Sequence, residues 1–285
     1  MRIVILGGTG LVGSYLKPQL ERHGHDVKVY GREAFDPGFD LAAELNGLDC
    51  LIQLSGANIG QRWTAAHQKR IWTSRVDLNH HLAKELQSLD EPPKRVIAAS
   101  AIGFYPESDC DHPLDESHTD AAQNAFGDLV QAWEKATQPL AAPERLVTFR
   151  FGVVLAAHGG ALGKMLPAFK LGLGGPIAGG QQCFSWVHID DLTQGFLFAL
   201  DHPEMHGTFN LTSPKPVSQA EFGRQLAHRL HRPFWLPVFR WQLRLLLGDG
   251  AQVLTVSQAV VPTQLTKAGF RFQYPTLDKA LENLF

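Results

Sequence analysis

The sequence predicts an α/β protein with a doubly wound parallel sheet and a small C-terminal lobe, on three observations. An apolar strand at 2–6 runs directly into a turn with glycines at positions 7, 10 and 13. Apolar segments of strand length then alternate with helical segments through the first half of the chain. These strands are apolar almost throughout, which is typical of strands buried on both faces of a parallel sheet. A chain of 285 residues is long enough for one large core and a smaller lobe.

The glycine turn carries the clearest functional signal. It joins the strand 2–6 to a helix expected at 11–23, which is how a βαβ unit binds a dinucleotide pyrophosphate. The glycines allow a tight turn, close approach of backbone to phosphate, and close packing of helix on strand, while the helix N-terminus supplies amides and a positive dipole end. A Rossmann-type domain that binds a dinucleotide is therefore expected. Its predicted loop contacts are Gly7, Gly8, Thr9, Gly10, Leu11, Val12 and Gly13.

The remaining elements follow in regular order. The expected order is strand 2–6, helix 11–23, strand 26–30, strand 49–54, helix 65–89, strand 94–99, helix 124–136 and strand 146–155. The first helix stops at Gly24, a suitable C-cap. A glycine-dense segment then interrupts the alternation, and beyond Pro203 the chain turns to short helices, aromatic residues and prolines. We predict a dinucleotide-binding domain over 1–202, with a substrate loop at 159–185, and a small lobe over 203–285.

Composition predicts a cytoplasmic protein without a nucleic-acid or membrane partner. The 26 basic and 28 acidic residues give a net charge of -2, which offers no electrostatic attraction to nucleic acid or membrane. The N-terminus is a core strand rather than a signal peptide. The apolar stretch 243–247 is far shorter than the ~18 residues that a membrane span requires.

The cysteines and histidines predict neither a disulfide nor a metal site. Cys50, Cys110 and Cys183 lie far apart without CxxC spacing, and an odd, sparse set is typical of reduced thiols. The 13 histidines form no ligand pattern with carboxylates. His202 and His206 have helical ligand spacing but fall in an expected loop.

The end of the second strand and the residues just past it, Tyr30-Gly31-Arg32-Glu33, are expected to select between NAD and NADP. In this fold a carboxylate there binds the ribose hydroxyls of NAD, whereas an arginine pairs with the additional phosphate of NADP. The chain has no acid at the strand tip and has Arg32 just beyond it. Gly31 leaves space for a phosphate, and a planar guanidinium suits one. We therefore predict NADP (NADPH) as cofactor; the alternative is a solvated Arg32 paired with Glu33.

Further predicted cofactor contacts fall at the ends of later strands, on the carboxyl edge where ligands of such folds bind. They are Leu54, Ser55, Gly56, Ala57, Ala99, Ser100, Gly152 and Val153. Arg75, on the helix after Ser74, could reach a phosphate of cofactor or substrate; an exposed helix arginine is the alternative.

Several segments resemble a known family. The segments 7–13, 54–57, 150–154 and 186–192 resemble the extended short-chain dehydrogenases/reductases. Other segments more narrowly resemble an atypical branch of NAD(P)-binding "epimerase family" proteins, which is similar to nucleoside-diphosphate-sugar epimerases. These segments are 62–64, 74–75, 100–105, 133–134, 159–162 and 171–176. The additional C-terminal domain of that branch is similar to this chain at residues 231–233, 247–248, 262 and 269–270. The resemblance implies a nicotinamide cofactor and an ancestry shared with nucleotide-sugar enzymes, but no particular substrate.

The resemblance also implies where catalytic residues should stand. Extended dehydrogenases use a serine or threonine after the strand that is here 94–99, and a tyrosine and a lysine four residues apart on the next helix. At these positions the chain has Ala101, Phe126 and Val130, none of which can exchange a proton. No tyrosine occurs nearby on that helix, and its only lysine is Lys135. The usual proton relay is therefore predicted to be absent.

Other groups near the expected cleft offer alternative chemistry. We predict that Tyr105, Lys164, Ser185 and His188 line one cleft facing the nicotinamide. Tyr105 follows the strand 94–99 directly, and its alternative is a packed loop aromatic. Histidine titrates near neutrality; the alternative for His188 is that it caps a helix, with Asp190 and Asp191, and ties the lobe to the sheet.

Three functional classes stay open. The first is an NADP-dependent oxidoreductase or epimerase that acts on a small or sugar-nucleotide-like substrate through unorthodox acid/base residues. The second is a redox-sensing or regulatory module that binds NADP(H) without turnover. The third, weaker, is an interaction protein whose partner docks on Phe234, Trp235, Phe239 and Trp241, although such a cluster is more often a small core. The sequence leaves the oligomeric state open; homodimers are common in the resembled family.

Overall fold

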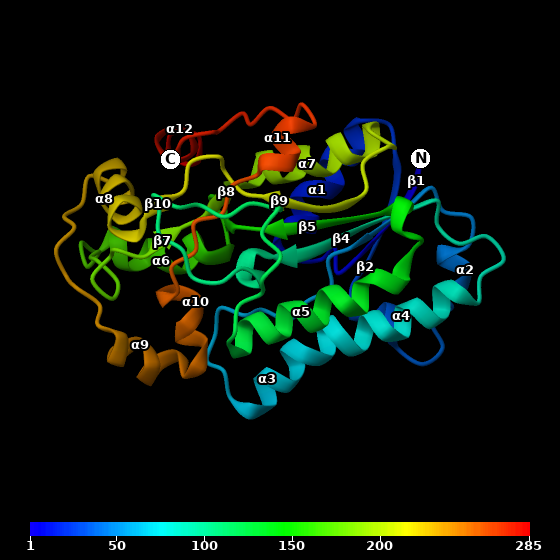
Figure 1. The fold of residues 1–285 in the computed structure, drawn as a ribbon, viewed down its shortest axis with the longest axis horizontal. Helices are drawn as coiled ribbons and strands as arrows, with labels where there is room; N and C mark the ends of the chain where they lie inside the picture. Colours follow the sequence, from blue (N-terminus) through cyan, green and yellow to red (C-terminus); the bar gives the residue numbers. More distant parts are fainter.

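A computed structural model, which describes residues 1–285, has an α/β fold with helices on both faces of a parallel sheet (Figure 1). The strands are β1 Arg2–Leu6, β2 Asp26–Tyr30, β3 Cys50–Gln53, β4 Arg95–Ala101, β5 Leu146–Phe151, β6 Val153–Leu155, β7 Cys183–Phe184, β8 Trp186–His188, β9 Gly207–Leu211 and β10 Val217–Ser218. The helices are α1 Leu11–Arg22, α2 Leu41–Leu45, α3 Ala65–Trp72, α4 Leu78–Gln87, α5 Ala125–Thr137, α6 Gly160–Lys170, α7 Ile189–Asp201, α8 Gln219–Arg229, α9 Arg240–Leu247, α10 Gln252–Thr255, α11 Thr263–Lys267 and α12 Leu277–Leu284.

The main sheet has the strand order β2-β1-β3-β4-β5-β9, and every neighbouring pair is parallel. In Figure 1, α1, α7 and α11 lie on one side of this sheet and α3, α4 and α5 on the other. The alternation of β1 follows from this layering: Ile3 and Ile5 pack in the core with α1 and α7, whereas Val4 and Leu6 pack in the core with α4. The predicted fold class is confirmed, and strand order reverses between β1 and β3, where such sheets bind ligands.

The expected strand at 146–155 is divided by Gly152 into β5 and β6. The amide of Gly152 donates to the carbonyl of Leu211 in β9, and β6 then leaves the main sheet to pair with β8. The expected helix at 65–89 is one continuous helical run, α3 and α4 joined by a π-helical turn at Thr73–Asp77. Both differences arise where the backbone changes direction or helical geometry locally. The pattern of apolar residues does not encode such local changes.

A smaller layer covers the end of the sheet shown at the left of Figure 1. Its core joins α6, α8 and α12 to Trp186, and includes Leu162, Phe222 and Leu281. The last strand of the main sheet, β9, lies beyond residue 202. The sheet therefore continues into the segment that the sequence assigned to the small lobe.

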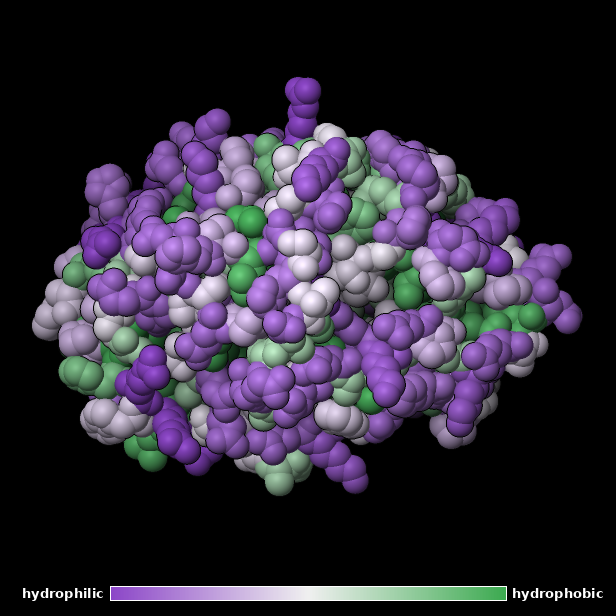
Figure 2. Space-filling view, in the orientation of Figure 1, coloured by the Kyte–Doolittle hydropathy of each residue, from purple (hydrophilic) through white to green (hydrophobic).

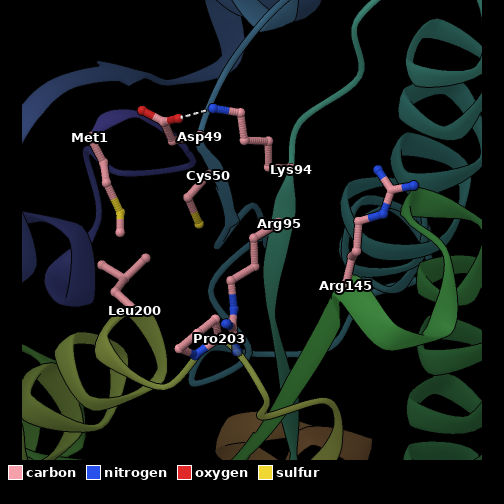
Figure 3. A pocket seen from close by; sticks show the side chains of 8 residues that line it. All are labelled: Met1, Asp49, Cys50, Lys94, Arg95, Arg145, Leu200 and Pro203. Carbon is pink, nitrogen blue, oxygen red and sulfur yellow. Dashed lines mark hydrogen bonds and ion pairs between the residues drawn. The ribbon is translucent and has the colours of Figure 1, made fainter.

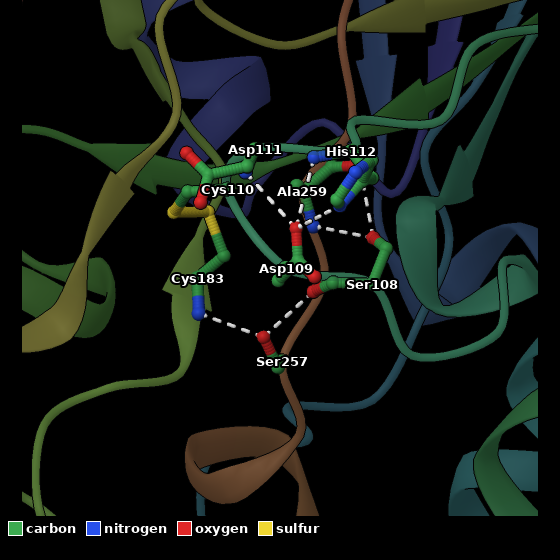
Figure 4. A network of polar contacts seen from close by, with 8 residues as sticks. All are labelled: Ser108, Asp109, Cys110, Asp111, His112, Cys183, Ser257 and Ala259. Atoms are coloured by element: carbon green, nitrogen blue, oxygen red, sulfur yellow. Dashed lines mark hydrogen bonds and ion pairs between the residues drawn. A yellow bond between two sulfur atoms is a disulfide. The ribbon is translucent and has the colours of Figure 1, made fainter.

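The expectation of three free cysteines is corrected by the structure, which pairs Cys110 with Cys183 (Figure 4). Their Cα atoms are 5.4 Å apart, although 73 residues separate them in sequence. Cys50 stays free and buried in β3. The pairing depends on the loop after β4 crossing β7, and no spacing rule reveals such a crossing.

A C-terminal segment, residues 257–261, runs beside this disulfide and is called the strap below. Ser257 Oγ donates to the Ser108 carbonyl at 2.7 Å and accepts from the Cys183 amide at 2.8 Å (Figure 4). Ala259 exchanges further hydrogen bonds with Ser108. The strap thus joins the loop after β4 to β7, the same two segments that the disulfide links.

We expect Cys110→Ser to lower the free energy of unfolding of the oxidised protein by about 2–4 kcal/mol, because the disulfide restricts the unfolded chain. Urea unfolding with and without reductant measures this. The stability difference should nearly vanish in reductant, where both proteins lack the bond. Thiol titration of the unfolded, unreduced wild type should detect Cys50 alone; detection of all three thiols would exclude the pairing.

Candidate functional site

The glycine turn packs too closely against its neighbours for any side chain. Gly7 has φ +74°, and a Cβ there would lie 2.5 Å from the Ser55 amide nitrogen. A Cβ on Gly13 would lie 2.2 Å from the Gly8 carbonyl oxygen. The first contact brings the turn against the loop after β3, and the second seats α1 on the turn. Both glycines are therefore required by geometry.

The N-terminus of α1 offers unpaired amides. The helix begins after Gly10, has no side-chain cap and has no acid in its first turn. The amides of Leu11, Val12 and Gly13 make no hydrogen bond within the chain. A Cβ added to Gly10 would meet only one atom within 4 Å, so the backbone there is open to a ligand. These amides and the helix dipole fit a pyrophosphate.

The loop after β3 is held from below by the π-helical turn. Ser74 Oγ accepts from the Ala57 amide at 2.9 Å, and Arg75 donates to the Ala57 carbonyl at 3.0 Å. The Arg75 guanidinium also lies 5.0 Å from the centre of the Trp133 ring. No carboxylate pairs with it, and burial lowers the pKa of Arg75 to about 10. Arg75 is thus a packed cation under the predicted cofactor loop rather than an exposed helix arginine.

The other predicted cofactor contacts lie at the same edge. Leu54 donates from its amide to Leu6 and leads into the loop after β3. Ala99 and Ser100 are buried residues of β4. Val153 donates from its amide to Ser185, so the β5–β6 junction is fixed by backbone pairing.

The tip of β2 carries two opposite charges. Arg32 is exposed, and Glu33 accepts a 2.5 Å hydrogen bond from the Gly31 amide. That hydrogen bond lowers the pKa of the Glu33 carboxyl. A Cβ on Gly31 would meet Glu33 at 2.7 Å and Thr9 at 3.3 Å. The residue at the tip of β2 is not acidic in sequence. The chain nevertheless turns back after Arg32, and this turn brings the Glu33 carboxylate to the tip.

The positions at which the resemblance places a proton relay are apolar in three dimensions as well. Val130 is buried in α5. The Phe126 ring lies directly against the backbone of Gly103, where a Cβ would clash with it. Its centroid is 6.2 Å from that of Trp63. Together with Ala101, these rings make the carboxyl edge above β4 an apolar surface.

A buried ion pair occupies the interior just behind this surface. Glu134 of α5 accepts from Arg150 Nε and Nη2, each at 2.7 Å, and from Ser100 Oγ at 2.6 Å. The Arg150 guanidinium stacks 3.5 Å from the centre of the Phe104 ring. The Ser100 hydroxyl is therefore already used as a donor within the fold. Sequence reasoning did not single out Glu134 in this role.

Two of the four predicted catalytic side chains meet at the strap. Tyr105 is fully buried and donates to Asn210 Oδ1 at 2.9 Å, and burial raises the pKa of its phenol. Ser185 Oγ accepts from the Val260 amide and donates to the Gln258 carbonyl, both at 2.8 Å. Gln258 in turn donates to the Tyr105 carbonyl. Both hydroxyls are hydrogen-bonded within the protein interior.

His188 caps the N-terminus of α7, which is the alternative to a catalytic role that we predicted from the sequence. His188 Nδ1 accepts from the Asp190 amide at 3.1 Å, and the ring centroid lies 3.9 Å from that of Tyr274, with the two planes tilted by 35°. Burial lowers the pKa of the imidazole. Asp191 accepts from the amides of Gln273 and Tyr274 at 2.6 and 3.0 Å, which ties α7 to the C-terminal segment.

Lys164 is the exposed member of the predicted set. It lies on α6, whose first residue, Gly160, packs on Leu11 of α1. Its ammonium donates to the Gly60 carbonyl in the long loop after β3. The strap thus links Tyr105 and Ser185, whereas Lys164 contacts the loop after β3 and His188 contacts the start of α7 and Tyr274.

A separate hollow of about 210 Å³ lies at the opposite, amino edge of the sheet (Figure 3). Its lining comes from the starts of β1, β3, β4 and β5 and from the end of α7: Met1, Asp49, Cys50, Lys94, Arg95, Arg145, Leu200 and Pro203. Asp49 is paired with Lys94 at 2.7 Å, and burial raises the pKa of Cys50 to about 12. The hollow offers no reactive group. No three His, Cys, Asp or Glu side chains are arranged to bind a metal ion.

Comparison with known proteins covers the whole chain. The pattern of the "NAD dependent epimerase/dehydratase family" matches residues 3–212, and a "Domain of unknown function (DUF1731)" matches residues 238–284. "Epimerase family protein SDR39U1" of Mus musculus is 36% identical over 293 residues, which covers 100% of this chain and 99% of the mouse protein. "Epimerase family protein YfhF" of Bacillus subtilis is 33% identical over 298 residues, covering 100% and 98%.

Solved structures of similar proteins share the fold of this chain. The human epimerase family protein SDR39U1 (isoform2), crystallised with NADPH, superposes with a TM-score of 0.91 at 33% identity, covering 100% of this chain and 99% of the human one. A nucleoside-diphosphate sugar epimerase from Corynebacterium glutamicum gives 0.77 at 28% identity, where 99% of this chain matches 57% of that protein.

We expect Asp191 to make stability fall with rising pH. Burial raises the pKa of its carboxyl to about 6, against ~3.9 in an unfolded chain, so the unfolded state loses this proton first. Stability from this group is therefore complete below about pH 4 and falls by about 3 kcal/mol as pH rises above 6. Asp191→Asn cannot titrate, so urea unfolding should show wild type losing that amount relative to the variant.

Asp201→Asn, at the exposed end of the same helix, is the matched control. It should show no comparable change relative to wild type over this pH range. A pH-independent difference between wild type and Asp191→Asn would contradict the raised pKa.

Proposed function

Because this chain belongs to the NAD-dependent epimerase/dehydratase family, we propose that it binds NADP(H) at the Gly7–Gly13 turn and lacks the family's tyrosine–lysine proton relay. Two observations at the carboxyl edge of the sheet together support the proposal. The dinucleotide end of the carboxyl edge is open and built for phosphate, whereas the relay positions hold apolar side chains.

The residues present fit a dinucleotide. The unpaired amides after Gly10 would hold the pyrophosphate, and the loop supported by Ser74 and Arg75 would lie along the nucleotide. Arg75 adds a positive charge with no acid to neutralise it inside the protein. The bound cofactor would supply or accept a hydride; the chain's own contribution is to bind and orient it.

NADP(H) rather than NAD(H) is proposed from Arg32 and from the human relative crystallised with NADPH. The exposed Arg32 guanidinium is free to pair with a 2′-phosphate. Glu33 acts in the opposite sense, since its carboxylate sits at the strand tip and repels a phosphate placed there. The selectivity of the site is set by the balance of these two neighbours.

Without the relay, we propose that the protein holds NADP(H) as a sensing or regulatory module and does not turn over sugar nucleotides or simple carbonyls. A positioned general acid or base contributes ~10²–10⁴ in rate, and the interior hydroxyls of Tyr105 and Ser185 are bonded within the protein. Phe126 and Trp63 present an apolar surface instead. This reading favours binding over proton transfer.

Lys164 supports a second candidate, an oxidoreductase that uses an unorthodox acid. Its ammonium is exposed and reaches across from α6 to the loop that follows β3. A ligand between these two segments would meet this donor. Of the four predicted catalytic side chains, it is the one at the surface.

The cofactor proposal predicts opposite effects of two adjacent substitutions. Arg32→Ala should weaken NADPH binding about 10- to 100-fold, because a charge-assisted contact of ~1.5–3 kcal/mol is lost, and should leave NADH binding nearly unchanged. Glu33→Gln should strengthen NADPH binding several-fold relative to NADH by removing a like charge. Fluorescence titration of each variant with both nucleotides measures this. Equal losses for NADPH and NADH in Arg32→Ala would show that Arg32 does not contact the 2′-phosphate.

The chemistry proposal predicts NADPH binding without appreciable oxidation of NADPH by sugar nucleotides or simple carbonyls, followed by absorbance. Any residual turnover should fall at least ~10²-fold in Lys164→Ala if that amine is an acid, and should persist in Lys170→Ala, a matched control on the same helix. Tyr105→Phe should lower stability and leave nucleotide affinity unchanged. Robust turnover that survives Lys164→Ala, Tyr105→Phe, Ser185→Ala and His188→Ala would overturn both readings.

A further inference from the structure

The largest exposed apolar side chains gather on one part of the molecule. Of the ten that are exposed, seven lie in two short segments. These are Leu171, Leu173, Trp235, Phe239, Trp241, Leu245 and Leu246, called the α9 surface below. The segments are joined by Trp235, whose amide donates to the Gly174 carbonyl at 2.9 Å and whose indole donates to Gly172 at 3.1 Å. Clustered exposure of this kind marks a contact surface rather than a core.

The same surface is basic. From Phe222 to Gly248 the chain contains no aspartate or glutamate. Arg240 and Arg244 lie on α9, and Arg232 donates to the Lys170 carbonyl, next to Leu171. Arg224 and Arg229 lie on α8 and line a separate hollow with Asp278, so they do not belong to the α9 surface. Arg240 and Arg244 are exposed, one turn apart on α9, and neither forms an ion pair. Figure 2 shows hydrophobic and strongly hydrophilic side chains next to one another at the lower left, where Figure 1 places α9.

We propose that the α9 surface binds the surface of an anionic lipid bilayer. Trp241 and Leu245 lie one turn apart and project from α9, 66% exposed each, so they can enter the apolar boundary of a membrane. Arg240 and Arg244 precede them at the same spacing and can meet lipid phosphates. An exposed helix with aromatic and leucine side chains between unpaired arginines has the composition of an interfacial membrane helix. No helix of the chain has the length and apolar character to cross the bilayer, so the contact is peripheral.

Two other occupants fit less well. A symmetric pair of chains would place this surface against itself and bring arginine against arginine, because no carboxylate lies among these residues to complement them. A bound peptide would need a groove, whereas Trp235, Trp241 and Leu246 project outward and are more than 60% exposed. The net charge of -2 for the whole chain conceals this local excess of positive charge.

The test is co-sedimentation of the full-length protein with vesicles of phosphatidylcholine alone and of phosphatidylcholine mixed with phosphatidylglycerol. We expect binding to the anionic vesicles to exceed binding to the neutral ones at least ~10-fold and to weaken as salt is raised. Arg240→Gln/Arg244→Gln should reduce the anionic partition coefficient ~10- to 30-fold. Trp241→Ser/Leu245→Ser should reduce it by at least ~10-fold, and the tryptophan emission of wild type should shift to the blue on binding.

Lys17→Gln/Arg22→Gln removes the same charge from α1, where Lys17 is half-buried beside Glu21 and Arg22 is exposed, and should leave vesicle binding unchanged. NADPH affinity and thermal unfolding of each variant show that it is folded. Equal binding to both vesicle types, or undiminished binding of Arg240→Gln/Arg244→Gln, would overturn the proposal. So would the absence of vesicle binding together with a dimer in size-exclusion chromatography that Trp241→Ser/Leu245→Ser dissociates, since the surface would then join two copies of this chain.

Discussion

The carboxyl edge of the sheet depends on one buried ion pair, between Glu134 and Arg150. It fixes α5 against β5, and through the Ser100 hydroxyl it also engages β4. Removal of one partner from such a pair leaves an uncompensated buried charge, which costs about 3–5 kcal/mol. The guanidinium also supports the Phe104 ring, and that loop in turn positions Tyr105 on Asn210 of β9. The polar side chains of this region are thus used to hold the strands and the loops that follow them in place.

This use of polarity explains the contrast between the two halves of the edge. Near α1 the backbone is bare, its amides are unpaired and Gly10 leaves space for a ligand. Near α5 the polar side chains face inward and Phe126 covers the backbone of Gly103. A site with free donors at one end and apolar rings at the other is suited to hold a nucleotide firmly. Proton transfer requires a titratable group at the apolar end, and Ala101, Phe126 and Val130 supply none there.

The parts of the fold that follow from local pattern were predictable from sequence. The strand–turn–helix around Gly7 and Gly13 and the alternation of strands and helices are encoded within short windows, and the structure confirms them. The family resemblance, confirmed by matches along the whole chain, rests on equally local motifs. The Cys110–Cys183 disulfide and the return of Glu33 to the β2 tip were not predictable, because each depends on how the chain folds back on itself. The burial of Tyr105 and Ser185 depends likewise on the strap, more than 70 residues away in sequence from either.

The strap affects the order in which parts of the protein fold during synthesis. Leu114 and Ser185 each bond to strap residues that are translated near the end of the chain. The strands from β1 to β5 can pair while synthesis continues, because their partners are already present. The loop after β4 and the segment around Ser185 have no such partner until residues 257–261 leave the ribosome. Nascent chains therefore acquire their sheet early, and these two segments are fixed in place last.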